Sequence, residues 1–156
     1  MILFLFFSLS FQKEAPEPIH VKLGDPILPI QIEDSQNNSY RLEDTLSDGF
    51  CIFLSTTCGM CTEALPVIEK LLAQNYPCTL LITQNANKEL GEDFLRLAKH
   101  PKVQVFFVKP EFLKQFNIKK LPAVLGYLEN QLVQAYHGPI NHENAERMLR
   151  IMEARR

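Results

Sequence analysis

The chain has 156 residues, of which 46% are hydrophobic, and its formal net charge at pH 7 is −2. This length and composition are typical of one globular domain with a hydrophobic core of ordinary size. The 16 basic residues do not outnumber the 18 acidic ones. We therefore set nucleic-acid binding aside, because it requires a basic surface.

The apolar periodicity and the turn signals predict a series of alternating strands and helices. The first elements are a β-hairpin at 28–33 and 39–42, a short helix or turn at 42–47, a strand at 50–55 and a helix from about 58 to 74. A strand at 79–83, a helix at 87–99 capped by Asn87 and a strand at 103–108 follow. The last elements are a short helix at 111–116, an antiparallel pair of strands at 123–128 and 132–136, and a closing helix at 142–155. This order predicts an α/β protein whose central sheet is flanked by helices.

The N-terminal part of the chain differs from the rest in composition. Residues 1–11 are almost entirely apolar, but a membrane-spanning helix needs about 20 apolar residues. We interpret them as the remaining end of a membrane anchor or export signal; the alternative is a disordered or core-packed apolar terminus. Residues 12–20 contain Pro16 and Pro18 and are predicted to be a linker, and residues 21–156 to form the domain.

Four cysteines are too few for a disulfide-rich scaffold in a chain that can build a core of this size. Their spacing contains one Cys-x-x-Cys pair, without a second pair or a Cys/His cluster suited to zinc. Cys51 and Cys78 lie in apolar strand segments, where we expect buried and unreactive thiols. The sequence thus predicts one reactive pair and no metal site.

The reactive pair is Cys58-Gly59-Met60-Cys61, which lies between the strand at 50–55 and the helix that follows. A helix N-terminus carries partial positive charge from its free N–H groups, so a cysteine placed there favours the thiolate. Cys61, three residues further on, falls on the same helical face and is expected to be more deeply buried. Cys58 is therefore the predicted nucleophile and Cys61 the resolving thiol; the alternative is two core cysteines that happen to lie three apart.

Two prolines carry further structural information. Pro66 lies inside the helix predicted at 58–74 and should kink it. Pro122, in Lys120-Leu121-Pro122-Ala123, precedes a predicted strand. It is either a simple loop terminator or a cis proline that brings its backbone against the reactive pair.

With these residues in place, the chain from 21 to 152 resembles the thioredoxin-fold proteins, and among them the membrane-anchored TlpA/ResA-like group. The matching segments are Gly24-Asp25-Pro26 with the following hairpin, the helix and strand at 87–108 as a central insertion, Pro66 in the active-site helix, Phe116-Asn117-Ile118 before Leu121-Pro122, and Tyr136-His137-Gly138. The run from Phe53 to Pro66 is also similar to MauD-like proteins, which assist maturation of disulfide-bearing partners.

The resemblance implies a thioredoxin-like fold with an N-terminal β-hairpin extension and a central helix–strand insertion. It implies a protein thiol–disulfide oxidoreductase in which Cys58 and Cys61 form the redox-active disulfide and no cofactor is needed. Because Gly59 and Met60 supply no charge that would stabilise the thiolate, the sequence favours a reductase over a strong oxidant. Leu121, in cis linkage to Pro122, is expected to contact the substrate together with Gly59 and Met60. The implied partners are protein clients and a membrane electron donor, on the extracytoplasmic side of a bacterial cell membrane.

The sequence also departs from these families. Thr57 stands where thioredoxin-like sites commonly have Trp. Ile52 occupies the place of the buried acid of thioredoxins, and Ala64 that of the glutamate of some ResA-like reductases. Neither proton acceptor is present, which argues against a haem-maturation role like that of the ResA-like reductases.

Two other functions remain open. A peroxiredoxin-like peroxidase on the same fold requires Pro-x-x-x-Thr/Ser-x-x-Cys; Ser55 fits the hydroxyl position, but Cys51 stands where the proline should be. A carrier of a soft metal such as Cu(I) would use Cys58 and Cys61 as ligands. Copper chaperones with this fold have a Cys-x-x-x-Cys spacing, one residue longer than the spacing here.

Overall fold

The computed structural model describes residues 21–83 and 89–156. Its strands are β1 (Gln31–Glu33), β2 (Ser39–Arg41), β3 (Gly49–Leu54), β4 (Cys78–Thr83), β5 (Val103–Val108), β6 (Ala123–Leu128) and β7 (Gln131–His137). Its helices are α1 (Leu42–Thr45), α2 (Gly59–Glu63), α3 (Leu65–Ala73), α4 (Glu92–Ala98), α5 (Glu111–Gln115) and α6 (His142–Ala154).

The seven strands form one mixed sheet in the order β2-β1-β5-β4-β3-β6-β7. The central strands β3, β4 and β5 run parallel, whereas β6 and β7 on one side and β1 and β2 on the other pair antiparallel. Every residue of β3, β4 and β6 is buried. This burial explains why those strands are continuous apolar runs in the sequence instead of alternating patterns.

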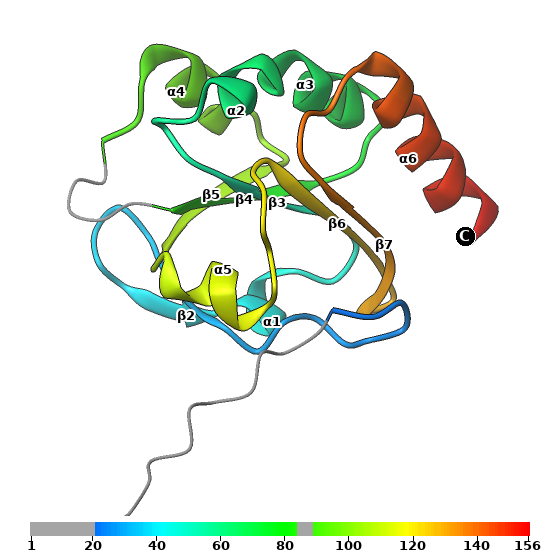
Figure 1. Ribbon diagram of the computed structural model, residues 1–156, viewed down its shortest axis with the longest axis horizontal. Helices are drawn as coiled ribbons and strands as arrows, with labels where there is room; N and C mark the ends of the chain where they lie inside the picture. The colour runs from blue at the N-terminus through cyan, green and yellow to red at the C-terminus, as the bar shows by residue number, and fades with distance from the viewer. Residues whose placement is uncertain (1–20, 84–88) are drawn as a thin grey trace, which may run out of the picture.

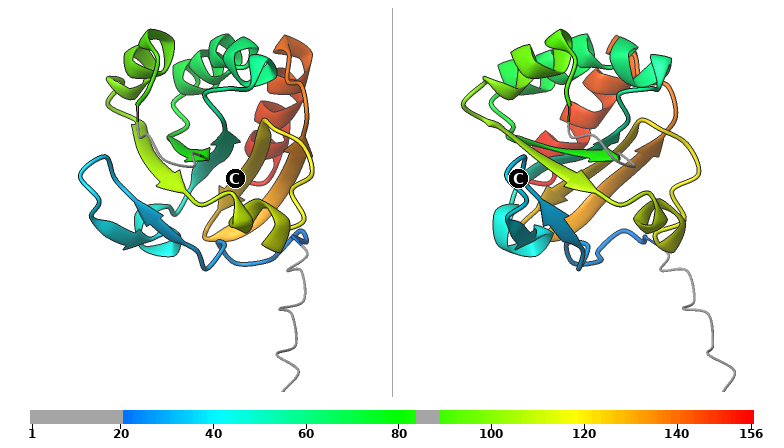
Figure 2. Two further views of the ribbon diagram at one scale, coloured as in Figure 1. Left: turned by 60° about the vertical axis from the view of Figure 1, so that its left-hand side comes forward. Right: turned by 90° about the vertical axis from the view of Figure 1, so that its left-hand side faces the viewer.

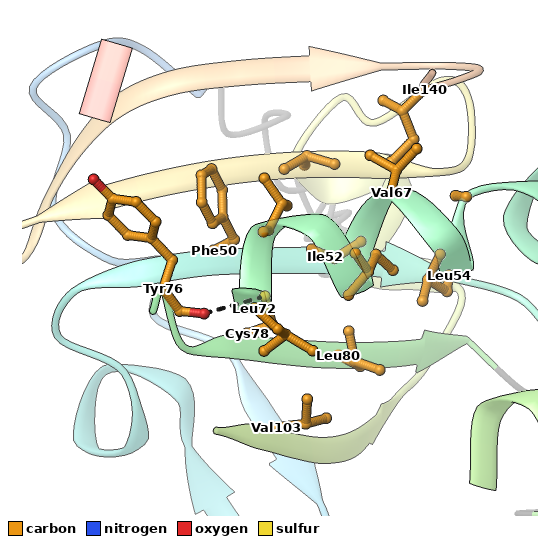
Figure 3. Close-up of a cluster of buried hydrophobic side chains, with 14 of the residues drawn as sticks. Phe50, Ile52, Leu54, Val67, Leu72, Tyr76, Cys78, Leu80, Val103 and Ile140 are labelled. Carbon is orange, nitrogen blue, oxygen red and sulfur yellow. Dashed lines mark hydrogen bonds between the residues drawn. The ribbon is translucent and has the colours of Figure 1, made fainter. Parts of the chain in front are cut away.

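Helices cover both faces of the sheet (Figure 1). Helices α2, α3, α4 and α6 lie on one face, and α1 and α5 lie on the other, as the turned views also show (Figure 2). Each face has its own hydrophobic core: Phe50, Ile52 and Leu54 point into the first, and Cys51 and Phe53 into the second. Figure 3 shows part of the first core, packed between β3, β4 and α3.

The predicted α/β class and the order of elements are confirmed, with corrections at several boundaries. The first hairpin strand begins at Gln31 instead of residue 28, because Pro29 has no N–H to donate to a neighbouring strand. Ile27, Leu28 and Ile30 are nevertheless buried in the second core. The last strand is longer than predicted and covers Gln131–His137.

Two predicted helices also differ from the structure. The helix predicted at 58–74 is divided into α2 and α3 at Ala64. Pro66 lies in the first turn of α3, which confirms the interruption expected from its missing N–H. The helix predicted at 87–99 begins only at Glu92, with Gly91 as its N-cap. Asn87, the predicted cap, lies outside the described residues.

The predicted anchor at 1–11 and linker at 12–20 also lie outside the described residues. Among residues 21–83 and 89–156, no helix has both the length and the apolar character needed to cross a membrane.

Candidate active site

The end of β3 positions the first cysteine of the pair. The strand is buried on both sides and ends at Leu54, and a short loop then leads to α2. Cys58 is the N-cap of α2, with extended backbone angles (φ −100°, ψ 115°). The loop is closed by the Cys58 N–H, which donates to the Ser55 carbonyl at 3.3 Å. The predicted strand-to-helix junction is therefore confirmed.

Cys58 is partly exposed, and its sulfur lies among backbone groups. It accepts a hydrogen bond at 3.3 Å from the Cys61 N–H, which lies in the first turn of α2 and also donates to the Cys58 carbonyl at 3.1 Å. The Leu121 carbonyl oxygen lies 3.9 Å from the same sulfur. An N–H donor at a helix start stabilises a sulfur that carries negative charge. The Cys58 sulfur therefore lies between a backbone N–H that donates to it and a backbone carbonyl to which its thiol can donate.

Cys61 is fully buried, as predicted. Its sulfur accepts a hydrogen bond from the Ser55 N–H at 3.5 Å. Burial, together with a smaller effect of its hydrogen bond with Cys58, raises the pKa of the Cys61 thiol to about 12. Both cysteines are free thiols in this structure. The pair thus consists of one accessible sulfur and one protected, protonated sulfur.

The peptide bond between Leu121 and Pro122 is cis, which confirms the expectation drawn from the resemblance. The Pro122 carbonyl accepts a hydrogen bond from the Gly138 N–H at 2.8 Å, so the loop is tied to the end of β7. Of the remaining predicted contact residues, Met60 is 41% exposed. No heavy atom lies within 4 Å of the Cβ position at Gly59, so the surface there is open. The four predicted substrate contacts therefore lie around or beside Cys58.

Comparisons of the folded chain with solved structures identify its architecture. A protein from Chlorobium tepidum described as the thiol:disulfide interchange protein DsbE superimposes with a TM-score of 0.66 and 16% identity, over 86% of this chain and 97% of that one. A thio-disulfide isomerase from Thermus thermophilus has a TM-score of 0.61 and 16% identity, over 85% of this chain and 97% of that one. A thiol peroxidase from Chromobacterium violaceum has a TM-score of 0.57 and 13% identity, over 89% of this chain and 91% of that one.

The fold is thioredoxin-like. A scan against protein-family models and a search of curated proteins both find no match. In this thioredoxin-like fold, β1 and β2 form the predicted hairpin extension, and α4 with β5 forms the predicted insertion.

One residue of this thioredoxin-like site was not recognised from the sequence as a positioning residue. Ser55 contacts both cysteines through its backbone, donating to the Cys61 sulfur and accepting from the Cys58 N–H. Its hydroxyl lies 3.0 Å from the Thr57 hydroxyl and accepts from the Thr57 N–H at 3.3 Å, which stabilises the loop. The only sequence signal was the run of hydroxyl residues before Cys58, which is typical of tight turns.

The two positions at which the resemblance would place an acidic side chain are occupied by apolar groups. Ile52 and Ala64 are both fully buried and line the first core. Among residues 21–83 and 89–156, no group of three or more His, Cys, Asp and Glu side chains could hold a metal ion. The predicted absence of a metal stays a prediction, since two thiols alone can bind a soft ion.

Cys51 and Cys78 are buried, as predicted. They point into opposite cores: Cys78 pairs with Phe50 across the two strands, and the side chain of Cys51, the next residue after Phe50, points to the other face of the sheet. Figure 3 shows Cys78 in the first core with its thiol directed to the Tyr76 carbonyl, 3.8 Å away. Burial raises the pKa of Cys78 to about 12 and raises that of Cys51 as well.

These buried thiols predict that the reduced protein loses stability in alkali. An unfolded cysteine loses its proton above a pH of about 8.5. The folded thiols of Cys51, Cys61 and Cys78 keep theirs, since burial raises their pKa. Unfolding then releases protons, so the free energy of unfolding falls between about pH 9 and 12, by up to about 1.4 kcal/mol per pH unit for each thiol.

Urea unfolding of the reduced protein at several pH values measures this slope. The Cys51→Ala variant should show a shallower decline than the wild type, whatever its stability at neutral pH. Val103→Ala is the control: it removes a comparable buried apolar group without a thiol, and its slope should equal that of the wild type. Equal slopes in all three proteins would contradict the prediction.

Proposed function

We propose that this protein is a thiol–disulfide oxidoreductase that exchanges disulfides with other proteins through Cys58 and Cys61. The observation that carries the proposal is the asymmetry of the pair. One sulfur is partly exposed at the start of α2, and the other is buried one turn further on. The thioredoxin-like fold and its solved neighbours, described as thiol:disulfide interchange proteins, support the same function.

The reaction proceeds in two exchanges. The Cys58 thiolate attacks one sulfur of the client disulfide; a new bond joins Cys58 to the client, and the other client sulfur leaves as a thiolate that takes up a proton. Cys61 then loses its proton and attacks the Cys58 sulfur, which releases the second client thiolate. The client gains two electrons and two protons, and Cys58 and Cys61 are left as a disulfide. An external dithiol donor resets the pair.

The contacts of the client follow from the surroundings of Cys58. The rim formed by Gly59, Met60 and the Leu121–Pro122 peptide is assigned to substrate binding. Met60 offers exposed apolar surface. The Leu121 carbonyl is close enough to Cys58 to accept a backbone N–H from an extended client segment beside the attacked sulfur.

The direction and place of the reaction belong to the same proposal. Beyond the start of α2 itself, no charged side chain between the two cysteines stabilises a thiolate, which favours a reductase over a strong oxidant. We assign residues 21–156 to the thioredoxin-like domain, 12–20 to a linker and 1–11 to an anchor or export signal. The protein would then act outside the cytoplasm and receive electrons from a membrane donor. A solved neighbour from Mycobacterium tuberculosis is described as a secreted disulfide oxidoreductase.

The reduction potential of the pair tests the proposal. The protein is equilibrated in graded thiol/disulfide buffers, and the fraction of oxidised Cys58–Cys61 is read from intact mass after alkylation. We expect a value near that of thioredoxin, about −270 mV. A value near about −120 mV would reverse the direction and make the protein a disulfide donor. The absence of any reversible couple would contradict thiol–disulfide exchange and favour the soft-metal carrier.

A peroxidase is the second candidate, because a thiol peroxidase shares the fold over 89% of this chain. The hydroxyl residue of the peroxidase motif corresponds to Ser55, whose hydroxyl is already hydrogen-bonded to the Thr57 hydroxyl. The proline expected in that motif is replaced by Cys51, fully buried in β3. Consumption of hydrogen peroxide at a rate that depends on Cys58 would favour the peroxidase over the oxidoreductase.

A further inference from the structure

The segment that leads into the active site from α5 is strongly basic. Residues 109–120 contain four lysines and one glutamate, Glu111, and thus have a net charge of +3 in a chain whose net charge is −2. The segment comprises α5 and the loop before β6. Figure 1 shows this loop (yellow) running from α5 across to the start of β6. The positive charge is therefore concentrated on one approach to the site.

Two of these lysines lie at the rim of the site. Lys119 and Lys120 are exposed and directly precede Leu121, whose carbonyl lies 3.9 Å from the Cys58 sulfur. The Lys120 side chain passes close to the hydrogen bond that joins Pro122 and Gly138, since its Cδ is 3.9 Å from the Cβ position at Gly138.

Neither ammonium group is neutralised by a carboxylate among residues 21–83 and 89–156. Within the parts of the chain that the structure describes, the ion pairs join Arg41, Lys70 and Arg96 to carboxylates, and Lys119 and Lys120 have no such partner. The one carboxylate of α2, Glu63, stands at the end of that helix away from Cys58. The two charges are therefore available to a bound client.

We propose that Lys119 and Lys120 select client proteins whose disulfide is flanked by acidic residues. This inference rests on the proposed function, because it concerns the choice of client at Cys58. A carboxylate within about 6–8 Å of an exposed ammonium group gains an attraction that changes a rate or affinity by about threefold in water. Two lysines acting together give about tenfold, and added salt screens the effect.

The test compares two disulfide peptides of equal length in single-turnover reduction by the wild-type protein. One peptide carries Asp on both sides of its cysteines and the other carries Lys, and a small uncharged disulfide serves as the reference. We expect the acidic peptide to be reduced at least tenfold faster than the basic one at low ionic strength, because the lysines also repel the basic peptide, and the two rates to converge in about 0.5 M salt. Rates are expressed relative to the uncharged disulfide.

The variant Lys119→Gln/Lys120→Gln should lose most of this preference. The matched control is Lys22→Gln, which removes an exposed lysine from the opposite end of the sheet, where Gly24 bonds to the Leu132 carbonyl. The control should keep the preference of the wild type.

Equal rates for the two peptides, or a preference that survives in the double variant, would overturn the inference but leave the proposed function standing. Lysine-dependent binding to vesicles of anionic lipid, with no preference between peptides, would overturn it in favour of a membrane contact. A protein that reduces none of the three disulfides would overturn the proposed function, and the inference with it.

Discussion

The Cys58→Ser variant is expected to lose turnover with any disulfide substrate, to below about 1% of the wild-type rate, because a serine hydroxyl is not a nucleophile towards sulfur at neutral pH. Cys61 cannot substitute for it, because its sulfur is fully buried and burial raises its pKa to about 12. Reduction of a peptide disulfide, followed by the release of free thiol, measures the loss.

The Cys61→Ser variant is the matched partner in this experiment. It keeps the accessible sulfur and the backbone N–H that donates to it, so the first exchange should still occur. The second cannot, and a mixed disulfide between Cys58 and the client should accumulate, detectable by intact mass under non-reducing conditions. Full turnover in the Cys58→Ser protein, or an equal yield of mixed disulfide from both variants, would contradict the assigned roles.

The Gly49→Ala variant should be destabilised by about 3 kcal/mol, through both backbone strain and steric overlap. Gly49 opens β3 with φ +116°, a conformation that side chains rarely adopt. A Cβ atom there would lie 2.9 Å from the Pro77 Cγ and closer still to the Pro77 carbonyl oxygen. That oxygen accepts the Phe50 N–H at 2.9 Å, so relief of the overlap would disturb the start of the central strand.

Thermal unfolding is the measurement, and for a chain of this size the expected loss corresponds to a decrease in Tm of about 10 °C. Gly59→Ala is the control, because the Cβ position at Gly59 meets no heavy atom within 4 Å and Ala favours the first turn of a helix. Its Tm should stay equal to that of the wild type or rise slightly. A Gly49→Ala protein as stable as the wild type would show that the start of β3 is more adaptable than this geometry implies.

Much of the site could be predicted because its chemistry is local. The apolar run at 50–55, the Cys-x-x-Cys pair and the helical spacing beyond it are neighbours in the chain. A strand that feeds a helix places the first cysteine at a helix N-terminus whatever the rest of the protein does. The same locality explains why the burial of Cys61 and the break in the helix at Pro66 were predicted correctly.

The contacts that complete the site are made by backbone groups, and only the tertiary structure decided them. The Leu121 carbonyl reaches the Cys58 sulfur across 63 positions of the chain, and the Ser55 N–H reaches Cys61 through a backbone group. Every residue other than proline carries such a group, so no side-chain pattern in the sequence marks which one will face a sulfur. The steric demand on Gly49 likewise arises from Pro77, which β4 brings alongside.

The sequence by itself therefore determined the α/β architecture, the order of its elements and the candidate pair of thiols, because periodicity and spacing are properties of neighbouring residues. The tertiary structure alone decided which backbone groups surround the Cys58 sulfur, and that Lys119 and Lys120 stand at its rim. Those properties depend on how β3, β6 and β7 are brought together in the sheet. Packing between distant segments, and not any local pattern, turns the Cys-x-x-Cys pair into a candidate active site.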